Sequence, residues 1–542
     1  MISYATGVAN RYLSHHGKQM AKQQTKSASF LSQIIIYGLG QALNYGIGFI
    51  LLPVYSRLMP EADYGRLEVL NRTMDIVALL FLTQYGIAYI RFYRDRTDEQ
   101  YRRLVTSTCM YVVFLVAGLM TTVMCATSVP VSQALFQSPV YSNYIILGAV
   151  RYLMQMAFIV PFLYFQATEQ PTKYIIISSA SFTTTLALNI VLLYTMADKV
   201  AAVLWAGILG TGIFVLAVGG PVFWRSAKKL NWGISWQIVK FSWSFTFLGF
   251  MSFVMNSGDR LILNRYFGAA EVGVYSAGYK IAQVLSTFVF SPTIRAWTAK
   301  MVDVLRQPEG VRFLARLTTY ALLLYSVLGL IVSVYSREIV SVMMDRRYFA
   351  CYTIIPIVIL AYAADGIQMF MDSGFYYTKK TYLKMWHGFS TAFCLVLYFL
   401  LIPRYGMMGA AWATVAAYAF FVTLTWYLSN RVLPAPYEFG KMAKILLAAV
   451  VVYLINYALE SYEYSHFLPV RTAAQLAYPW LYLIVVIIIK APLIWLYAAA
   501  LHRLHVLEPE DKARLLEFVD GLRSRFTPNS SALPPVMPSG ID

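Results

Sequence analysis

Charged residues are scarce in this chain, and acidic residues are the scarcer kind. Asp, Glu, Lys and Arg together make up 13% of the 542 residues, against about 25% in an average soluble domain. There are 26 acidic residues against 44 Lys and Arg, while hydrophobic residues reach 59%. This composition excludes an ordinary soluble domain and indicates an integral membrane protein.

Motifs for metals, disulfides and nucleotides are also missing. The four cysteines lie in or beside apolar segments and form no C-x-x-C pair, which argues against a disulfide framework and against a zinc site. No G-x-x-x-x-G-K-[ST] motif for nucleotide phosphates occurs. We therefore expect no cofactor. Energy for any transport would come from a proton or sodium gradient, from the membrane potential or from substrate flow.

Both ends of the chain are polar. Residues 1–30 contain no apolar core before a cleavage site, which argues against a signal peptide and predicts a cytoplasmic amino terminus. Met20 could equally be the true start. The tail, residues 501–542, begins with a predicted amphipathic helix on the cytoplasmic face of the membrane and ends in a predicted disordered segment.

Between these ends the sequence predicts about fourteen transmembrane helices, because a span needs about 20 mostly apolar residues. Lys and Arg gather in alternate connecting segments, such as "WRSAKKLNW" and "TKKTYLK". The positive-inside rule then places both termini in the cytoplasm. The fold class is an all-α polytopic membrane protein. The excess of basic residues is explained by this topology, so no nucleic-acid partner is expected.

Two stretches of the chain match at a constant offset of 208 residues. "YSRLMPEADYGRLEVLNR", which starts at Tyr55, matches "LNRYFGAAEVGVYSAGYK", which starts at Leu263. The shift pairs Arg57 with Arg265, Asp63 with Glu271, Gly65 with Gly273 and Arg72 with Lys280. An even number of spans separates the copies, so the repeats are parallel. Parallel repeats are related by an axis along the membrane normal.

The duplication and the apolar segments predict two pseudo-symmetric six-helix lobes plus two extra helices. The expected divisions are a cytoplasmic amino-terminal segment 1–30, a first lobe 31–224, a cytoplasmic linker 225–240, a second lobe 241–430, two appended spans 431–500 and a cytoplasmic amphipathic tail 501–542.

The two repeated regions resemble a known family. "GLGQALNYGIGFILLPVYSRLMPEADYGRLEVL" and "FMSFVMNSGDRLILNRYFGAAEVGVYSAGYKIAQVL" are similar to the Wzx-like oligosaccharide flippases of the multidrug/oligosaccharidyl-lipid/polysaccharide exporter (MOP) superfamily. The second stretch is the more specific, through Asp259, Arg260, Leu263 and Gly268.

This resemblance implies two six-helix lobes around a cavity and no enzymatic activity. It implies a flippase that moves undecaprenyl-diphosphate-linked oligosaccharide units across the bacterial inner membrane by alternating access, for O-antigen or exopolysaccharide biosynthesis. The implied partners are the polyprenyl-diphosphate-linked oligosaccharide, membrane lipids, and a polysaccharide polymerase or export machinery.

Charged residues inside spans are costly and are therefore candidate functional residues. The candidates for binding the diphosphate are the cations Arg72, Arg151, Arg260 and Lys280. The candidates for ion coupling are the acids Asp75, Asp259 and Asp365. A local salt bridge with Asp75 is an alternative for Arg72. Arg260 and Asp259 are neighbours that should point about 100° apart, so we expect one of them to face the cavity.

Asp372 lies seven positions after Asp365, so both should lie on one helix face, and a paired structural role is favoured for Asp372. Lys490, in the last span, is expected to bond to a neighbouring helix.

The repeated motif has two interpretations. In the favoured one, Asp63 and Glu271 cap incoming helices, while Gly65 and Gly273 permit tight turns. In the other, these residues together with Arg57 and Arg265 form an external gate whose charges pair when the outside closes.

Three other functions are alternatives to a flippase. Glu61 and Asp63 resemble the acidic pair of lipid-sugar glycosyltransferases, but the short external loops leave no room for a catalytic domain. A cation-coupled exporter of drugs or metabolites with the same architecture is the main alternative. It would favour acids over bases at the cavity wall. A channel or scaffold would leave the charges within spans unexplained.

Overall fold

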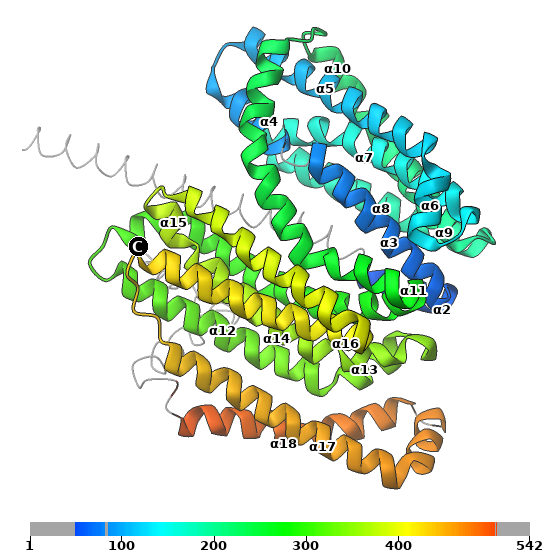
Figure 1. Ribbon diagram of the computed structural model, residues 1–542, viewed down its shortest axis with the longest axis vertical. Coiled ribbons are helices and arrows are strands. Elements are labelled where there is room, and N and C mark those ends of the chain that lie inside the picture. Colours follow the sequence, from blue (N-terminus) through cyan, green and yellow to red (C-terminus); the bar gives the residue numbers. More distant parts are fainter. Residues whose placement is uncertain (1–48, 82–84, 478, 505, 507–542) are drawn as a thin grey trace, which may run out of the picture. The chain divides into compact units, whose positions relative to one another are not determined.

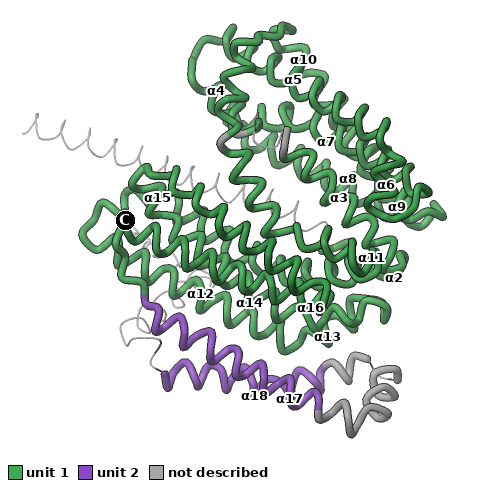
Figure 2. The backbone as a smooth tube through the Cα atoms, viewed as in Figure 1, with its two compact units in different colours: residues 1–437 green, residues 438–542 purple. Residues whose placement is uncertain are grey.

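The computed structural model describes residues 49–81, 85–477, 479–504 and 506, and no strand occurs among them. The described chain is built almost wholly of helices (Figure 1). It forms two compact units, residues 1–437 and 438–542, coloured separately in Figure 2. The predicted terminal segments, 1–30 and most of 501–542, lie outside the described residues.

The first half of unit 1 contains a series of helices that ends at Arg225. They are α2 (Leu52–Leu58), α3 (Glu61–Phe81), α4 (Tyr85–Asp95), α5 (Glu99–Ala126), α6 (Ser128–Phe136), η1 (Pro139–Tyr141), α7 (Ser142–Ala167), α8 (Pro171–Thr195), α9 (Lys199–Phe214), η2 (Val215–Gly219) and α10 (Gly220–Arg225). Two of these helices begin at an aspartate N-cap. Asp98 accepts the N–H groups of Gln100 and Tyr101 at the start of α5, and Asp198 accepts that of Ala201 at the start of α9.

The second half begins with a helix of 74 residues and ends at Asn430. Its elements are α11 (Trp232–Leu305), α12 (Gly310–Val334), α13 (Ser336–Met343), η3 (Arg346–Thr353), α14 (Ile355–Met371), α15 (Ser373–Tyr377), η4 (Thr381–Trp386) and α16 (His387–Asn430). In Figure 1 the cyan helices of the first half and the yellow-green helices of the second half form two groups, and α11 runs from one group to the other.

Two glycines divide the longest helices. Gly268 in α11 has φ +80° and Gly406 in α16 has φ +54°, so each interrupts the helical backbone. Glycine has no Cβ and adopts positive φ without the steric penalty that other residues meet. Each of these helices therefore consists of two consecutive segments that meet at a sharp break.

Helix boundaries repeat with the offset of 208. Helix α5 ends at Ala126 and α12 ends at Val334, and α6 starts at Ser128 while α13 starts at Ser336. Helix α9 starts at Lys199, whose counterpart at position 407 directly follows the Gly406 break. These boundaries of corresponding helices in the two halves thus coincide under one shift, as the pseudo-symmetric fold predicts.

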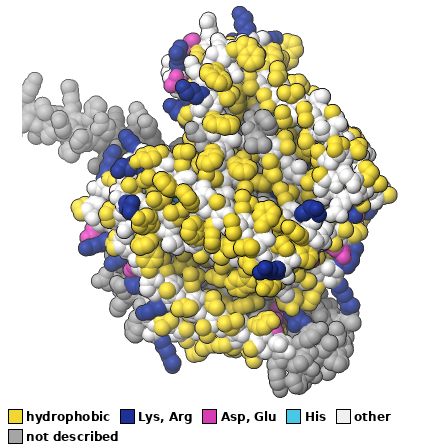
Figure 3. Space-filling view, in the orientation of Figure 1, with side chains coloured by type: hydrophobic (Ala, Val, Ile, Leu, Met, Phe, Trp, Pro, Cys, Tyr) yellow, Lys and Arg dark blue, Asp and Glu magenta, His cyan; other side chains and the backbone are white. Residues whose placement is uncertain are grey.

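The protein is a multi-pass membrane protein. Among the described residues, nine helices are long and apolar enough to span a membrane, or up to ten if one bent helix pair counts as a span. Helix α5 exposes Phe114, Leu115 and Leu119, as a helix that faces lipid does. Hydrophobic side chains cover much of the face shown in Figure 3. The predicted count of fourteen stays a prediction, because the expected first span lies largely outside the described residues.

Unit 2 contains α17 (Phe439–Ala477) and α18 (Pro479–Arg503). The Lys490 Nζ donates to the Glu460 Oε1 at 2.5 Å, and Asn456 also donates to that oxygen, at 3.3 Å. A buried charge is costly without a partner. This bond between helices is the role expected for Lys490. The divisions between segments given by the sequence stay predictions.

The expectation that Gly65 and Gly273 permit tight turns is wrong. Both lie inside helices, in α3 and α11, and the turn glycine of this region is Gly268. A Cβ built on Gly65 would collide with the carbonyl oxygen of Ala269, and one on Gly273 would collide with that of Glu61. These two glycines therefore allow α3 and α11 to pack backbone against backbone.

Candidate functional site

Two cavities in unit 1 contain most of the predicted charged residues. The smaller, which we call the first-half cavity, has a volume of ≈ 240 Å³. The larger, the second-half cavity, has a volume of ≈ 370 Å³. Helices α3, α7, α9 and α11 all contribute to the wall of the first-half cavity. The charged residues that line it are Glu68, Arg72, Asp75, Arg151 and Lys280.

Glu68 is the central charge of the first-half cavity. Its side chain is only 2% exposed, and its carboxylate forms an ion pair with Lys280, which comes from the other half of the chain. The other carboxylate oxygen lies 3.5 Å from Arg72 Nη2. Arg72 and Lys280 are equivalent under the 208 offset, so one buried carboxylate serves both copies of the same cation.

Arg151 approaches the same cavity from α7. Its Nη1 donates to the Asn71 Oδ1 at 3.1 Å. A Cβ on Gly207 would lie 2.5 Å from the Arg151 Nε and 2.8 Å from its Cδ. Glycine at position 207 of α9 therefore leaves the space that the arginine side chain occupies. Among the described residues, the guanidinium of Arg151 has this amide and no carboxylate as its partner.

Arg72 also forms the local pair considered as an alternative. Its Nη1 lies 2.8 Å from the Asp75 Oδ2, and the Asp75 side chain is half exposed. Three of the four predicted cations, Arg72, Arg151 and Lys280, thus line one cavity, together with the predicted acid Asp75.

Arg260 and Asp259 pair with each other, although neighbours on a helix point about 100° apart. Arg260 Nη1 lies 3.0 Å from the Asp259 Oδ1, and Tyr275 donates to the Asp259 Oδ2 at 2.5 Å. The guanidinium also lies 4.1 Å from the centroid of the Tyr279 ring. The long arginine side chain bends back over its neighbour, so Cβ directions alone did not decide the contact. Both residues are buried, and neither lines the first-half or the second-half cavity.

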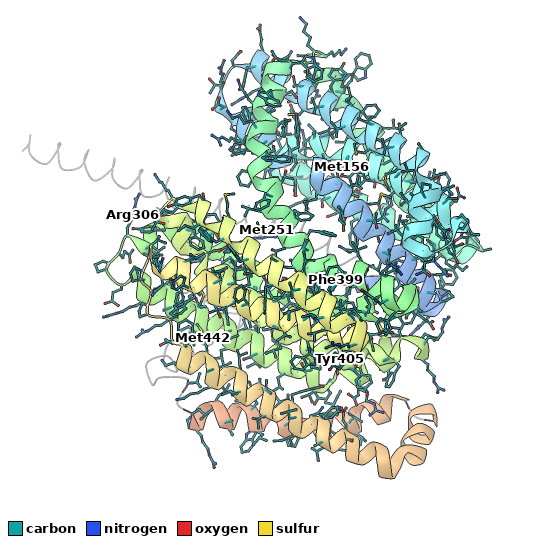
Figure 4. All side chains as sticks on the ribbon, in the orientation of Figure 1. Met156, Met251, Arg306, Phe399, Tyr405 and Met442 are labelled. Atoms are coloured by element: carbon teal, nitrogen blue, oxygen red, sulfur yellow. The ribbon has the colours of Figure 1, made fainter. Side chains whose placement is uncertain are left out.

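The second-half cavity is lined by α11, α14, η4 and α16, and Met251 on α11, labelled in Figure 4, is part of its wall. Asp365 and Asp372 both line it, as their seven-residue spacing on one helix face predicts. Asp372 accepts from the Lys384 Nζ at 2.6 Å. Asp365 forms no ion pair or hydrogen bond with another described residue.

The predicted external charges do not pair with one another. Asp63 pairs with Arg66, and Arg57 donates to the Val342 carbonyl oxygen at 3.4 Å. Glu271 accepts the Met407 N–H at 2.9 Å. Glu271 therefore caps the helix segment that follows the Gly406 break, and not the helix on which it lies. Arg265 is exposed and forms no ion pair with another described residue.

A different set of contacts joins the two halves near these residues. The Asp345 N–H donates to Ser56 Oγ and Arg347 Nη2 donates to the Ser56 carbonyl oxygen, each at 3.4 Å. The buried Tyr348 hydroxyl donates to the Met59 carbonyl oxygen at 3.1 Å. The backbone N–H of Arg347, and then its guanidinium, hold the pKa of Asp345 below its usual value. We call Ser56, Met59, Asp345, Arg347 and Tyr348 the latch.

Sequence reasoning missed Glu68 and the latch. Glu68 lies four residues before Arg72, the spacing of a helical ion pair, so the sequence held a signal for it. The partners of Tyr348 and Arg347 are carbonyl oxygens, and a bond to a distant carbonyl leaves no mark in the sequence.

The comparisons with known proteins agree with this fold. A family model described as polysaccharide biosynthesis protein matches residues 30–298. A search of curated proteins found no match.

Among solved structures, one described as lipid II flippase MurJ in an inward closed conformation has a TM-score of 0.67 at 9% identity, over 86% of this chain and 98% of that one. An inward-facing multidrug resistance MATE family transporter of the MOP superfamily has a TM-score of 0.56 at 12% identity, over 72% and 94%. A point mutant of the Vibrio cholerae MATE transporter VcmN has a TM-score of 0.55 at 14% identity, over 76% and 98%. Residues 30–298 thus resemble the polysaccharide biosynthesis protein family, and the chain has the fold of the MOP-superfamily transporters.

Proposed function

We propose that this protein is a flippase that moves an undecaprenyl-diphosphate-linked oligosaccharide from the cytoplasmic to the outer leaflet of a bacterial inner membrane. The product would serve O-antigen or exopolysaccharide biosynthesis, where a polymerase or export machinery would receive it. Both termini would lie in the cytoplasm. The family description and the basic first-half cavity support this proposal.

The observation on which the proposal rests is the charge of the first-half cavity. Arg72, Arg151 and Lys280 line it, against the two acids Glu68 and Asp75. A diphosphate has about two negative charges, and each would cost several kcal/mol in hydrocarbon without a partner. Arginine offers two parallel N–H donors to phosphate oxygens, and the partner of Arg151 is a neutral amide. Arg151 is therefore the first contact that we assign to the diphosphate.

Glu68 gives the cations of this site an alternative ion partner to the diphosphate. Without substrate it neutralises Lys280 and lies near Arg72. A bound diphosphate would compete with Glu68 for both cations. Because Lys280 comes from the second half and Glu68 from the first, this exchange would break an ion pair between the two halves. Substrate binding and the relative movement of the halves would thus be linked, which alternating access requires.

Ion coupling is a further part of the proposal, and among the three predicted acids it falls to Asp365. Asp259 is already paired with Arg260, and Asp75 with Arg72. Asp365 lines an open cavity with no ion partner among the described residues. A carboxylate in that setting can take up a proton or Na⁺ during the transport cycle.

One observation favours the alternative, a cation-coupled exporter of drugs or metabolites. The same unpaired Asp365 would attract a cationic substrate to the second-half cavity, and the fold is shared with MATE transporters. The charges separate the two functions. A diphosphate substrate requires Arg151 and Lys280, whereas a cationic drug would be repelled by them.

The test uses Arg151→Ala and Lys280→Ala in a host whose own flippase gene is deleted. Each lost charge-assisted bond is worth about 1.5–3 kcal/mol, so surface polysaccharide should fall at least tenfold when it is normalised to the amount of protein in the membrane. Arg151→Lys should restore part of the activity. Arg404→Ala, at an exposed position that lines neither cavity, is the matched control. Normal polysaccharide in both alanine variants, with drug resistance lost in Asp365→Asn, would favour the exporter.

A further inference from the structure

The second-half cavity has the size and the side chains of a site for a polar organic molecule. Its volume of ≈ 370 Å³ falls within the roughly 300–1,000 Å³ of ordinary small-molecule sites, whereas a single ion needs far less. Two glutamines in its wall offer amide groups to a ligand. Gln283 is exposed, and the side-chain nitrogen of Gln368, a residue 4% exposed, has no hydrogen-bond partner among the described residues. An unpaired buried N–H donor is costly, which indicates a ligand that accepts a hydrogen bond from Gln368, while the exposed amide of Gln283 can both donate and accept.

Rigid aromatic rings lie in the same wall. Tyr418 is 1% exposed, and its hydroxyl donates to the Asn256 Oδ1 at 2.8 Å. Phe421 packs edge-on against the His387 ring, with 4.6 Å between centroids. Both rings are thus fixed before any ligand arrives. Amides together with an aromatic ring suit a sugar, because hydroxyl groups bind the amides and the C–H face of a pyranose packs on the ring.

One helix face links this cavity to the cations of the first-half cavity. Lys280, Gln283 and Thr287 follow each other on α11 at positions i, i+3 and i+7, so they form one stripe. Lys280 lines the first-half cavity, and the other two line the second-half cavity. Three residues of helix rise about 4.5 Å. A diphosphate held by Lys280 therefore places the sugar bonded to it beside Gln283.

A metal site explains this cavity less well. No group of three or more His, Cys, Asp or Glu side chains that could hold a metal ion occurs in the described part of the chain. Asp372 is paired with Lys384, which leaves Asp365 as the one carboxylate of this wall without an ion partner among the described residues. One carboxylate can serve a coupling ion, but it does not account for the two glutamines or the volume.

From these contacts we infer that the second-half cavity binds the sugar nearest the diphosphate of the transported lipid, with Gln283 and Gln368 as its hydrogen-bond partners and Phe421, which is partly exposed, as its stacking surface. This inference rests on the proposed function. It divides the substrate between two sites, with the diphosphate in the first-half cavity and the sugar in the second-half cavity.

The test compares two kinds of water-soluble lipid on the full-length protein in nanodiscs. One is farnesyl diphosphate, and the other is farnesyl diphosphate linked to glucose, galactose or N-acetylglucosamine. At least one sugar-linked lipid should bind wild-type protein about tenfold more tightly than farnesyl diphosphate. Gln283→Ala and Gln368→Ala should each reduce this preference about fivefold and leave the affinity for farnesyl diphosphate unchanged, since one neutral hydrogen bond is lost. Gln133→Ala, at an exposed position on α6, is the control.

The outcomes separate the two proposals. If farnesyl diphosphate does not bind, the proposed function fails. If it binds but no attached sugar increases the affinity, or if both glutamine variants keep the full preference, the sugar site is overturned while the diphosphate site stands. The sugar site would also be overturned if the cavity bound Na⁺ alone. In that case Na⁺ would stabilise the wild-type protein against heat, Asp365→Asn would abolish this stabilisation, and no sugar-linked lipid would bind more tightly than farnesyl diphosphate. Gln283 is exposed, so its replacement tests the site even if Gln368→Ala fails to fold.

Discussion

At the scale of the residue, one acid decides how the first-half cavity is charged. Glu68 is 2% exposed and is shared between Lys280 and Arg72. A buried charge without a partner is strongly unfavourable, so the three residues depend on each other. The counterpart of Glu68 under the 208 offset is Ser276, so this acid is not duplicated. The shared carboxylate breaks the symmetry of the two halves.

We predict that Glu68→Gln destabilises the protein by about 3–5 kcal/mol, because Lys280 would then lose its counter-charge, whereas Arg72 would keep Asp75. The double variant Glu68→Gln/Lys280→Gln should be more stable than Glu68→Gln alone, since it removes both members of the pair. Thermal unfolding in nanodiscs measures both effects. Strictly additive losses in the double-mutant cycle would show that Glu68 and Lys280 do not interact.

Part of this site could be predicted from the sequence. Arg72, Arg151 and Lys280 are recognisable because charges are rare inside apolar segments, and all three line one cavity. Their grouping depends on how α3, α7 and α11 pack, which spacing within a helix cannot give. The Arg260–Asp259 pair shows a second limit of sequence reasoning. Cβ directions on a helix do not determine contacts, because a long side chain can reach a neighbour that its Cβ points away from.

At the scale of the element, α3 and α11 pack backbone against backbone where the two halves meet. Gly65 would place a Cβ 2.9 Å from the Gly273 nitrogen, and Gly273 would place one 3.1 Å from the Gly65 nitrogen. Glu61 and Ala269, the other two partners, are also 208 residues apart. Gly65 meets Ala269, and their counterparts Gly273 and Glu61 meet in the same way. Such reciprocal contacts make the interface self-complementary about a two-fold axis.

We predict that Gly65→Ala and Gly273→Ala open the protein on the side expected to be external. The added methyl group meets backbone atoms of the other helix, which cannot rotate away, so α3 and α11 must separate. Labelling of Gln283→Cys by a membrane-impermeant maleimide from outside, in a background without the native cysteines, should increase several-fold.

Gly118→Ala is the matched control for both glycine variants, because a Cβ there meets nothing within 4 Å. Unchanged labelling in both variants would mean that the glycine contact does not keep the halves closed. The latch at Tyr348 supports the same closure from the second half. On the other side of the pseudo-two-fold axis, Asn264, the counterpart of Ser56, donates to the Leu135 carbonyl oxygen at 2.6 Å.

Elements were more predictable than their contacts. The 208 offset, found from four matched positions, extends to the ends of α5 and α12 and to the starts of α6 and α13. The role of Gly65 and Gly273 was misassigned, because a repeated spacing of glycines does not distinguish a turn from a close helix contact. Among the glycines of the described residues, Gly268 and Gly406 are the two with positive φ.

At the scale of the whole molecule, duplication has produced two cavities with unlike chemistry. The first-half cavity has three cations and two acids, whereas the second-half cavity has amides, hydroxyls, aromatic rings and two acids against Lys384. A symmetric pair of cavities would bind two copies of one group. An asymmetric pair suits a substrate with an anionic part and a neutral polar part, which a lipid-linked sugar is.

The last prediction concerns the energy source of the complete cycle. Asp365 lines the second-half cavity without an ion partner among the described residues, so it is the carboxylate there that is free to take up a proton or Na⁺. Asp365→Asn keeps the shape of the side chain and removes its charge. Transport into proteoliposomes should therefore lose its dependence on the ion gradient, while binding of farnesyl diphosphate stays normal.

Asp303→Asn, at an exposed acid near the end of α11, should retain the dependence and is the control. Gradient-dependent transport at the normal rate in Asp365→Asn would remove this residue from coupling. Another group would then couple transport to the gradient. If wild-type transport itself showed no dependence on an ion gradient, the energy would have to come from the membrane potential acting on the diphosphate, or from consumption of the lipid-linked product on the other side. Setting the potential to zero with a potassium ionophore distinguishes these two, because only the first would stop transport.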